Sequence, residues 1–184
     1  MGNLWSIFIG FLYPSEEPGP STLRQAAIGT GIHLGVAVKP PDFSDLPDVY
    51  YAIASEEFSS VTAENHCKMS YIANDWADFD FTDCNSQYQW ALANDQQFRF
   101  HVLVWARANS NHKNPKFINE SEDDDAKEQF MIDYITAVMN EYGESVYAYD
   151  VMNEALGDHD HPYKGIDDWF CKAFKAARAA NPSS

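Results

Sequence analysis

The sequence predicts an α/β fold, because segments with the properties of short buried strands alternate with segments of helical periodicity. Residues 98–106 hold Val102, Leu103 and Val104 in a row, as expected of a parallel strand that is covered on both faces. Residues 127–142 repeat apolar side chains every four positions, which indicates an amphipathic helix. About four such β/α units fit the chain, and neither an internal repeat nor a shift in composition indicates a second compact domain.

Four segments have the composition of strands, with β-branched, aromatic or other apolar residues in short runs. They are residues 31–38, residues 58–63, residues 98–106 and the segment that begins at Val146. Four further segments have helical periodicity. They are residues 48–57, 82–95, 127–142 and 167–180.

The third of these helices has the clearest ends. Ser121 followed by Asp124 suits an N-terminal cap, and the acidic residues beside them favour the positive end of the helix dipole. Gly143 follows the last turn, where a C-cap is expected. The fourth helix is expected to stop at Asn181-Pro182.

The overall composition is that of a folded protein with an acidic surface. Hydrophobic residues make up 45% of the chain and aromatic residues 15%, which excludes a low-complexity or disordered chain. The formal net charge of −16 repels phosphate backbones, so we expect no nucleic acid partner. No window approaches the roughly 20 apolar residues of a membrane span.

Residues 1–22 are expected to form an apolar segment and a linker, so that the domain occupies residues 23–184. The apolar run at residues 4–13 has about the length of a signal-peptide core, although no Lys or Arg precedes it. Gly2 and Ser6 also fit a myristoylation pattern. A signal remnant, a lipidated terminus and an apolar segment packed on the domain therefore remain alternatives, and we expect a secreted, extracellular protein.

Polar side chains gather where the predicted strands end. They are Glu64, Asn65 and Lys68 after the second strand, His101 and Trp105 in the third, and Asn153 and Glu154 in the fourth. In a parallel α/β barrel these positions meet at the mouth, where the chemistry takes place. Amides and charged groups bind sugar hydroxyls, an indole covers a sugar ring, and a carboxylic acid with a raised pKa protonates a glycosidic oxygen.

The motifs around these residues resemble those of glycoside hydrolase family 10, the retaining endo-1,4-β-xylanases. "YDVMNEAL" resembles the D-V-x-N-E-A/P motif of that family, "VTAENHCK" its T-x-E-N-x-x-K segment and "HVLVW" its H-x-L-V-W strand. "GIHLGVAV" is similar to the first strand, and "FDFTD" to the stretch before the second helix. The resemblance implies a (β/α)8 TIM barrel, of which this chain holds about the first four units.

The resemblance also implies a role for each residue in the hydrolysis of β-1,4-xylosidic bonds in xylan. Glu154 would be the general acid/base, and Asn153 would hydrogen-bond the 2-hydroxyl of the sugar. Glu64, Asn65 and Lys68 would hold sugars on the non-reducing side. His101 and Trp105 would line the subsite where the bond breaks. No cofactor is implied.

The chain departs from the family pattern in several places. The nucleophilic carboxylate ends a later strand in the family, and this chain has no counterpart of it. The H-S-Q motif is replaced by Ala106-Arg107-Ala108, Pro115-Lys116-Phe117 stands for P-x-W, and Met69 replaces a Trp. An inactive xylan-binding half-barrel or a truncated fragment is therefore the alternative. Self-association or a partner that supplies the second half would cover the open barrel edge.

Cysteine and acidic clusters give weaker signals. Cys67, Cys84 and Cys171 allow one disulfide without indicating which pair forms it. Residues 158–161 alternate Asp and His, and residues 120–125 are acidic, but neither has the spacing of a metal site. We expect no bound metal.

Overall fold

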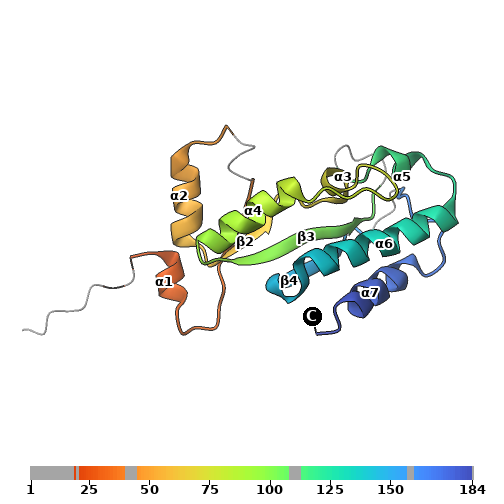
Figure 1. Ribbon diagram of the computed structural model, residues 1–184. Coiled ribbons are helices and arrows are strands. Elements are labelled where there is room, and N and C mark those ends of the chain that lie inside the picture. Colours follow the sequence, from red (N-terminus) through yellow and green to blue (C-terminus); the bar gives the residue numbers. More distant parts are fainter. Residues whose placement is uncertain (1–18, 20, 40–44, 108–112, 157–159, 184) are drawn as a thin grey trace, which may run out of the picture.

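The computed structural model describes residues 19, 21–39, 45–107, 113–156 and 160–183. It contains a parallel four-stranded sheet in the order β1-β2-β3-β4 (Figure 1). The strands are β1 (Gly35–Val38), β2 (Ser60–Ala63), β3 (Gln97–Trp105) and β4 (Ala148–Asn153). Since the spatial order follows the order in the chain, the sheet is wound in one direction, as in a barrel.

Helices connect the successive strands and one more helix follows β4, as the alternation predicted. The longer ones are α2 (Asp48–Glu57), α4 (Thr82–Ala93), α6 (Asp124–Tyr142) and α7 (Trp169–Ala180). Short helices that were not predicted are α1 (Leu23–Ala27), α3 (Met69–Ile72), α5 (Lys116–Glu120) and the 3-10 turn η2 (Gly143–Ser145). In the parts of the chain that the structure describes, no helix has both the length and the apolar character needed to cross a membrane.

Several predicted boundaries are wrong, for local reasons. β1 begins at Gly35 rather than at residue 31, and Gly31 itself has a φ of 76°, outside the extended region. α7 begins at Trp169 rather than at residue 167, because Asp168 is in the left-handed region. α4 ends at Ala93 rather than at residue 95.

The N-terminal cap of α6 also differs from the prediction. Its cap is Asp123, whose Oδ1 accepts from the Ala126 amide at 2.9 Å, whereas Ser121 Oγ accepts from the Asp123 amide at 3.1 Å. Asp124 pairs with Lys127 at 2.6 Å. Part of the acidic run at 120–125 therefore starts the helix.

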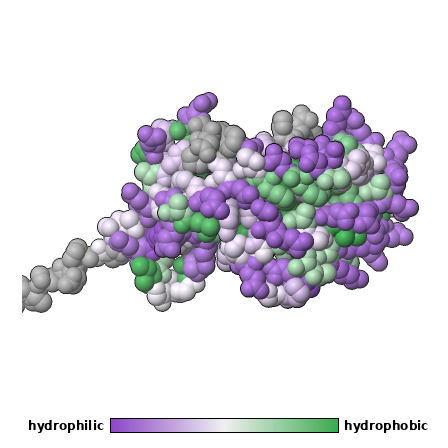
Figure 2. Space-filling view, in the orientation of Figure 1, coloured by the Kyte–Doolittle hydropathy of each residue, from purple (hydrophilic) through white to green (hydrophobic). Residues whose placement is uncertain are grey.

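The core lies between the sheet and helices α4 and α6. Phe98 and Phe100 of β3 are buried against aromatic rings of those helices, with Phe98 5.5 Å from Tyr88 and Phe100 5.5 Å from Tyr142 between ring centroids. Figure 2 shows hydrophobic side chains in the half of the molecule that holds α5 and α6, with hydrophilic side chains around them. On the opposite side of β3, Arg99 and His101 are partly exposed, since the sheet is open there.

The structure resolves the question of which cysteines pair. Cys67 and Cys84 form a disulfide, and both are fully buried. It joins the loop after β2 to the first turn of α4. Cys171 is exposed and free.

Candidate functional site

The carboxyl ends of β2, β3 and β4 lie at one edge of the sheet. Val38 is paired with Ala63, and Trp105 with Asn153, so that β1 ends level with β2 and β3 ends level with β4. β2 pairs with the first residues of β3, and the loop after β2 carries Lys68 forward to the Trp105 ring. Six of the seven predicted site residues lie at or just after these ends, and His101 lies four positions earlier in β3. The structure thus brings the predicted site residues to the carboxyl-terminal end of the sheet.

Trp105 and Glu154 are joined directly. The indole Nε1 donates to Glu154 Oε2 at 2.7 Å, and the Ala106 amide donates to the Asn153 carbonyl at 3.0 Å. Glu154 has a φ of 53°, so the chain turns sharply as it leaves β4. This turn presents a carboxylate that is 38% exposed.

Lys68 lies over the indole of Trp105, a residue that is itself only 6% exposed. Its Nζ donates to Asn65 Oδ1 at 2.7 Å and is 4.9 Å from the centroid of the Trp105 ring. Only 5% of Lys68 is exposed. Burial lowers the pKa of Lys68, and the nearby Lys113 ammonium lowers it further, against the opposing fields of Glu64 and Glu154.

His101 is held by a carboxylate that was not among the predicted site residues. Its Nδ1 lies 2.9 Å from Asp150 Oδ2, and its ring contacts Trp105 edge to face with 5.8 Å between centroids. Arg99 Nε donates to the same carboxylate at 3.1 Å. Burial raises the pKa of Asp150, but the hydrogen bonds from His101 and Arg99 outweigh it, so that the pKa is lowered.

The sequence held a signal for Asp150, because it is the acidic residue of the "YDVMNEAL" motif, and the structure places it opposite His101 in the β3–β4 register. A β-bulge follows this pair, since the next recorded partners are Val104 and Met152. Two residues of β3 therefore face one residue of β4.

The loop after β3 adds two residues that the sequence did not indicate. Asn114 is 4% exposed, and its Nδ2 donates to the carbonyls of Trp105 at 2.9 Å and of Arg107 at 3.2 Å. Its neighbour Lys113 places Nζ 4.3 Å from the centroid of the Trp105 ring. Arg107 Nη1 lies 4.0 Å from Glu154 Oε2. Ala108 lies outside the described residues.

The described residues include no group of three His, Cys, Asp or Glu side chains arranged to hold a metal ion. Two residues of the Asp-His run, Asp158 and His159, lie outside the described ranges. His161 packs on Trp169, with 4.8 Å between ring centroids.

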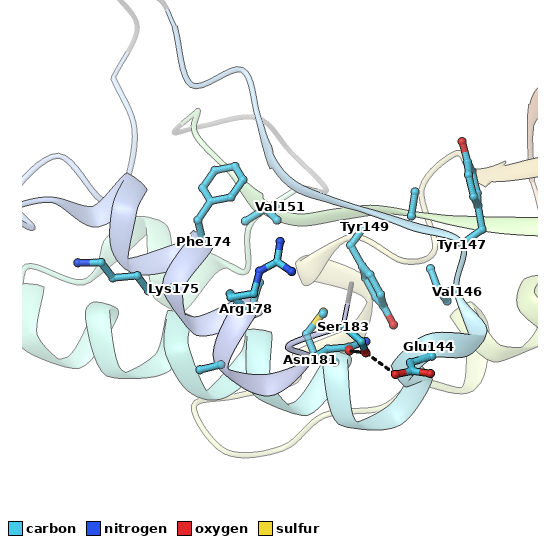
Figure 3. Close-up of a pocket in the computed structure, with 14 residues that line it drawn as sticks. Glu144, Val146, Tyr147, Tyr149, Val151, Phe174, Lys175, Arg178, Asn181 and Ser183 are labelled. Carbon is cyan, nitrogen blue, oxygen red and sulfur yellow. Dashed lines mark hydrogen bonds between the residues drawn. The ribbon is translucent and has the colours of Figure 1, made fainter.

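A separate hollow of about 1010 Å³ lies beside β4 and α7 (Figure 3). Phe174 and Arg178 of α7 lie opposite Val151 and Tyr149 of β4 in this view. Within the described part of the chain, β4 has β3 as its only strand partner. The hollow therefore lies beside an edge strand of the described sheet.

The comparisons with known proteins agree with this geometry. The profile of Glycosyl hydrolase family 10 matches residues 22–184. Endo-1,4-beta-xylanase A of Cellvibrio japonicus is 32% identical over 150 residues, which are 72% of this chain and 23% of that protein. The chain therefore shares its sequence pattern with one part of a larger protein.

Solved structures show the same relation. Native xylanase 10B from Thermotoga maritima has a TM-score of 0.79 at 26% identity and covers 89% of this chain, which spans 51% of that structure. A variant of xylanase 10C from Cellvibrio japonicus in complex with xylopentaose has a TM-score of 0.72 at 26% identity and covers 83% of this chain. This chain spans 33% of the xylanase 10C structure, so both neighbours extend well beyond the part that it matches.

Proposed function

Because the chain belongs to Glycosyl hydrolase family 10, we propose that it forms the acid/base half of a xylanase active site that acts on β-1,4-xylan. The observation that carries this proposal is the hydrogen bond from Trp105 to Glu154 beside Asn153. It holds a carboxylate at the carboxyl end of the sheet, where the chemistry of a (β/α)8 barrel takes place. The catalytic domain is proposed to occupy residues 23–184.

Glu154 is proposed to act as the general acid and then as the general base. In a retaining reaction it protonates the glycosidic oxygen, and after the glycosyl intermediate has formed it takes a proton from the attacking water. The nucleophile must lie about 5 Å from it. We assign no carboxylate of this chain to that role, and propose that it comes from a further β/α unit.

The remaining site residues are proposed to bind the sugar. Asn153, next to Glu154, would hydrogen-bond the 2-hydroxyl. Glu64, Asn65 and Lys68 would hold the next sugars, with Lys68 already oriented by Asn65. His101 and Trp105 would form the wall of the central subsite, where their rings already meet edge to face.

The open side of β4 is proposed to receive the second half of a barrel, or a second copy of this chain. Support comes from the hollow beside β4 and α7, because exposed backbone groups of an edge strand pair readily with another strand. The solved relatives also extend well beyond the part that this chain matches.

An extracellular location is proposed on chemical grounds. The disulfide between Cys67 and Cys84 is a bond that persists in oxidising compartments. A polymeric substrate such as xylan fits the same location.

The proposal is tested by completing the barrel. The chain is joined to the second half of xylanase 10B from Thermotoga maritima, and release of reducing sugar from soluble xylan is measured. We expect release that falls at least about 100-fold in Glu154→Gln, because general acid catalysis is worth about 10² to 10⁴ in rate. Glu120→Gln serves as the control, since Glu120 lies on α5 and pairs with Lys116. Equal activity of the Glu154→Gln chimera would contradict the assignment.

A second candidate is a half-barrel that binds xylan without cleaving it. The replacement of the family H-S-Q motif by Ala106-Arg107-Ala108 favours it. Two results together would favour this candidate over the enzyme. The chimera would be folded but inactive, and the unaltered chain would still bind xylo-oligosaccharides.

A further inference from the structure

Two ammonium groups lie over the Trp105 ring, and a guanidinium lies beside the carboxylate to which its indole donates. These three cations stand together although the whole chain holds 28 acidic and only 12 basic residues. Lys68 and Lys113 place their ammonium groups 4.9 Å and 4.3 Å from the centroid of its ring. Arg107 lies 4.0 Å from Glu154, the carboxylate to which the indole donates. The candidate site thus concentrates positive charge within an acidic protein.

Lys113 is the unusual member of this group. Among the described residues, no carboxylate is close enough to its ammonium group to form an ion pair, for which the limit is 4.0 Å. The ammonium group lies over the Trp105 ring instead. Other lysines on the surface do find acidic partners: Lys116 pairs with Glu120 at 3.6 Å, and Lys164 with Asp160 at 2.5 Å. Placing Lys113 beside a second ammonium, that of Lys68, costs free energy, and an anion bound at this place would offset that cost.

Arg107 complements Lys113 in chemistry. Its side chain is 54% exposed, so that solvent and a ligand can reach it beside the site. A guanidinium binds a carboxylate through two parallel hydrogen bonds, and an ammonium adds a compact charge. Both residues belong to the segment after β3, where the chain differs from the family pattern.

We propose that Lys113 and Arg107 bind the carboxylate of an acidic sugar, so that the preferred ligand is a β-1,4-xylan substituted with uronic acid. The inference rests on the proposed function, because it places the xylan backbone against Trp105. A side-chain uronic acid on a sugar in that position would extend toward the Lys113 ammonium. A neutral xylan would leave the two cations without an anionic partner from the ligand.

The test is isothermal titration calorimetry of the purified chain at low ionic strength. The acidic ligand is a xylo-oligosaccharide with one 4-O-methylglucuronic acid substituent. The matched neutral ligand is the same oligosaccharide after chemical reduction of its carboxyl group to an alcohol. We expect the acidic ligand to bind at least about tenfold tighter, because hydrogen bonds to a charged group are stronger than those between neutral groups. Rising salt is expected to reduce this ratio.

Variants identify the residues responsible for the ratio. Lys113→Gln and Arg107→Gln are each expected to reduce the preference for the acidic ligand, and Lys113→Arg is expected to retain most of it because the charge is kept. Lys116→Gln is the matched control from the neighbouring helix and leaves the ratio unchanged. Far-ultraviolet circular dichroism verifies that each variant is folded.

The outcomes separate this inference from the proposed function. If the unaltered chain binds both ligands equally, the inference is overturned and the proposed function stands. If a preference persists in the Lys113→Gln, Arg107→Gln double variant, the assignment of these residues is overturned. If neither ligand binds at millimolar concentration, the proposed function fails and the inference fails with it.

Discussion

The Nε1 of Trp105 donates a 2.7 Å hydrogen bond to Oε2 of Glu154, which joins the last residue of β3 to the first residue after β4. Through this contact, the indole on β3 orients the partly exposed carboxylate that follows β4. It depends on the parallel register in which Trp105 is opposite Asn153. The geometry of the proposed acid/base is therefore a direct product of how these two strands pair.

A double-mutant cycle measures this contact. Trp105→Phe removes the N–H donor, and Glu154→Ala removes the acceptor. We expect a coupling free energy of about 0.5 to 1.5 kcal/mol, because contacting pairs that share a hydrogen bond are not additive. Urea unfolding of the four proteins gives the value. Additive effects of the two substitutions would contradict the contact.

Asp150 is expected to make stability depend on pH. Burial raises its pKa, but the hydrogen bonds from His101 and Arg99 prevail and lower it from the ordinary value of 3.8. The folded state therefore binds this proton less readily than the unfolded state, so the stabilisation is present above about pH 4 and is lost as the pH falls through the folded pKa.

The measurement compares the free energy of unfolding of the unaltered protein and of Asp150→Asn from pH 7 to pH 3. The difference should be largest near neutral pH and should shrink below about pH 4. Asp167→Asn serves as the control, because Asp167 is an exposed carboxylate just before α7. A difference that stays constant over this range would show that the ionisation of Asp150 is not what stabilises the fold.

The disulfide is expected to contribute strongly to stability. Cys67 and Cys84 are 17 residues apart, and a loop of about that length is worth roughly 3 kcal/mol when it is closed. The double variant Cys67→Ala, Cys84→Ala should lose about that much in urea unfolding. Binding of xylo-oligosaccharides should weaken too, since Lys68 adjoins Cys67. Cys171→Ala should change neither quantity, and a double variant as stable as the unaltered protein would refute this role.

Asn114 is expected to support the site from the loop after β3. Asn114→Ala removes hydrogen bonds to the carbonyls of Trp105 and Arg107 and leaves them without this donor. The expected loss is about 1 to 3 kcal/mol in the free energy of unfolding. Affinity for xylo-oligosaccharides should fall as well. Asn94→Ala, which removes a single hydrogen bond to Trp90 at the end of α4, is the comparison.

Much of the fold could be predicted, because short apolar runs indicate strands and apolar residues at helical spacing indicate helices. The long helix α6 repeats its apolar residues over five turns, whereas α3 and α5 have four and five residues, too few to display a period. The start of β1 was missed because the positive φ of Gly31 depends on the path of the chain, which composition does not specify.

In the candidate site too, some residues could be predicted from the sequence and others could not. Trp105 and Glu154 could be placed together, because the carboxyl ends of parallel neighbours share one edge. Lys113 and Asn114 could not, since they come from a loop whose course follows from tertiary contacts and not from a repeating pattern. The pairing of Cys67 with Cys84 required the packing of the β2–α3 loop on α4, so the sequence left it open.

The most direct test of the account is calorimetric titration of the purified chain with xylohexaose, beside the variants Trp105→Ala and Trp76→Ala. Trp76 is a partly exposed indole that packs on Phe117 of α5 at 5.0 Å between ring centroids and is not among the proposed sugar-binding residues. We predict that the unaltered chain and Trp76→Ala bind the sugar and that Trp105→Ala loses the binding. Equal binding by Trp105→Ala, or no binding by the unaltered chain at millimolar sugar, would contradict it.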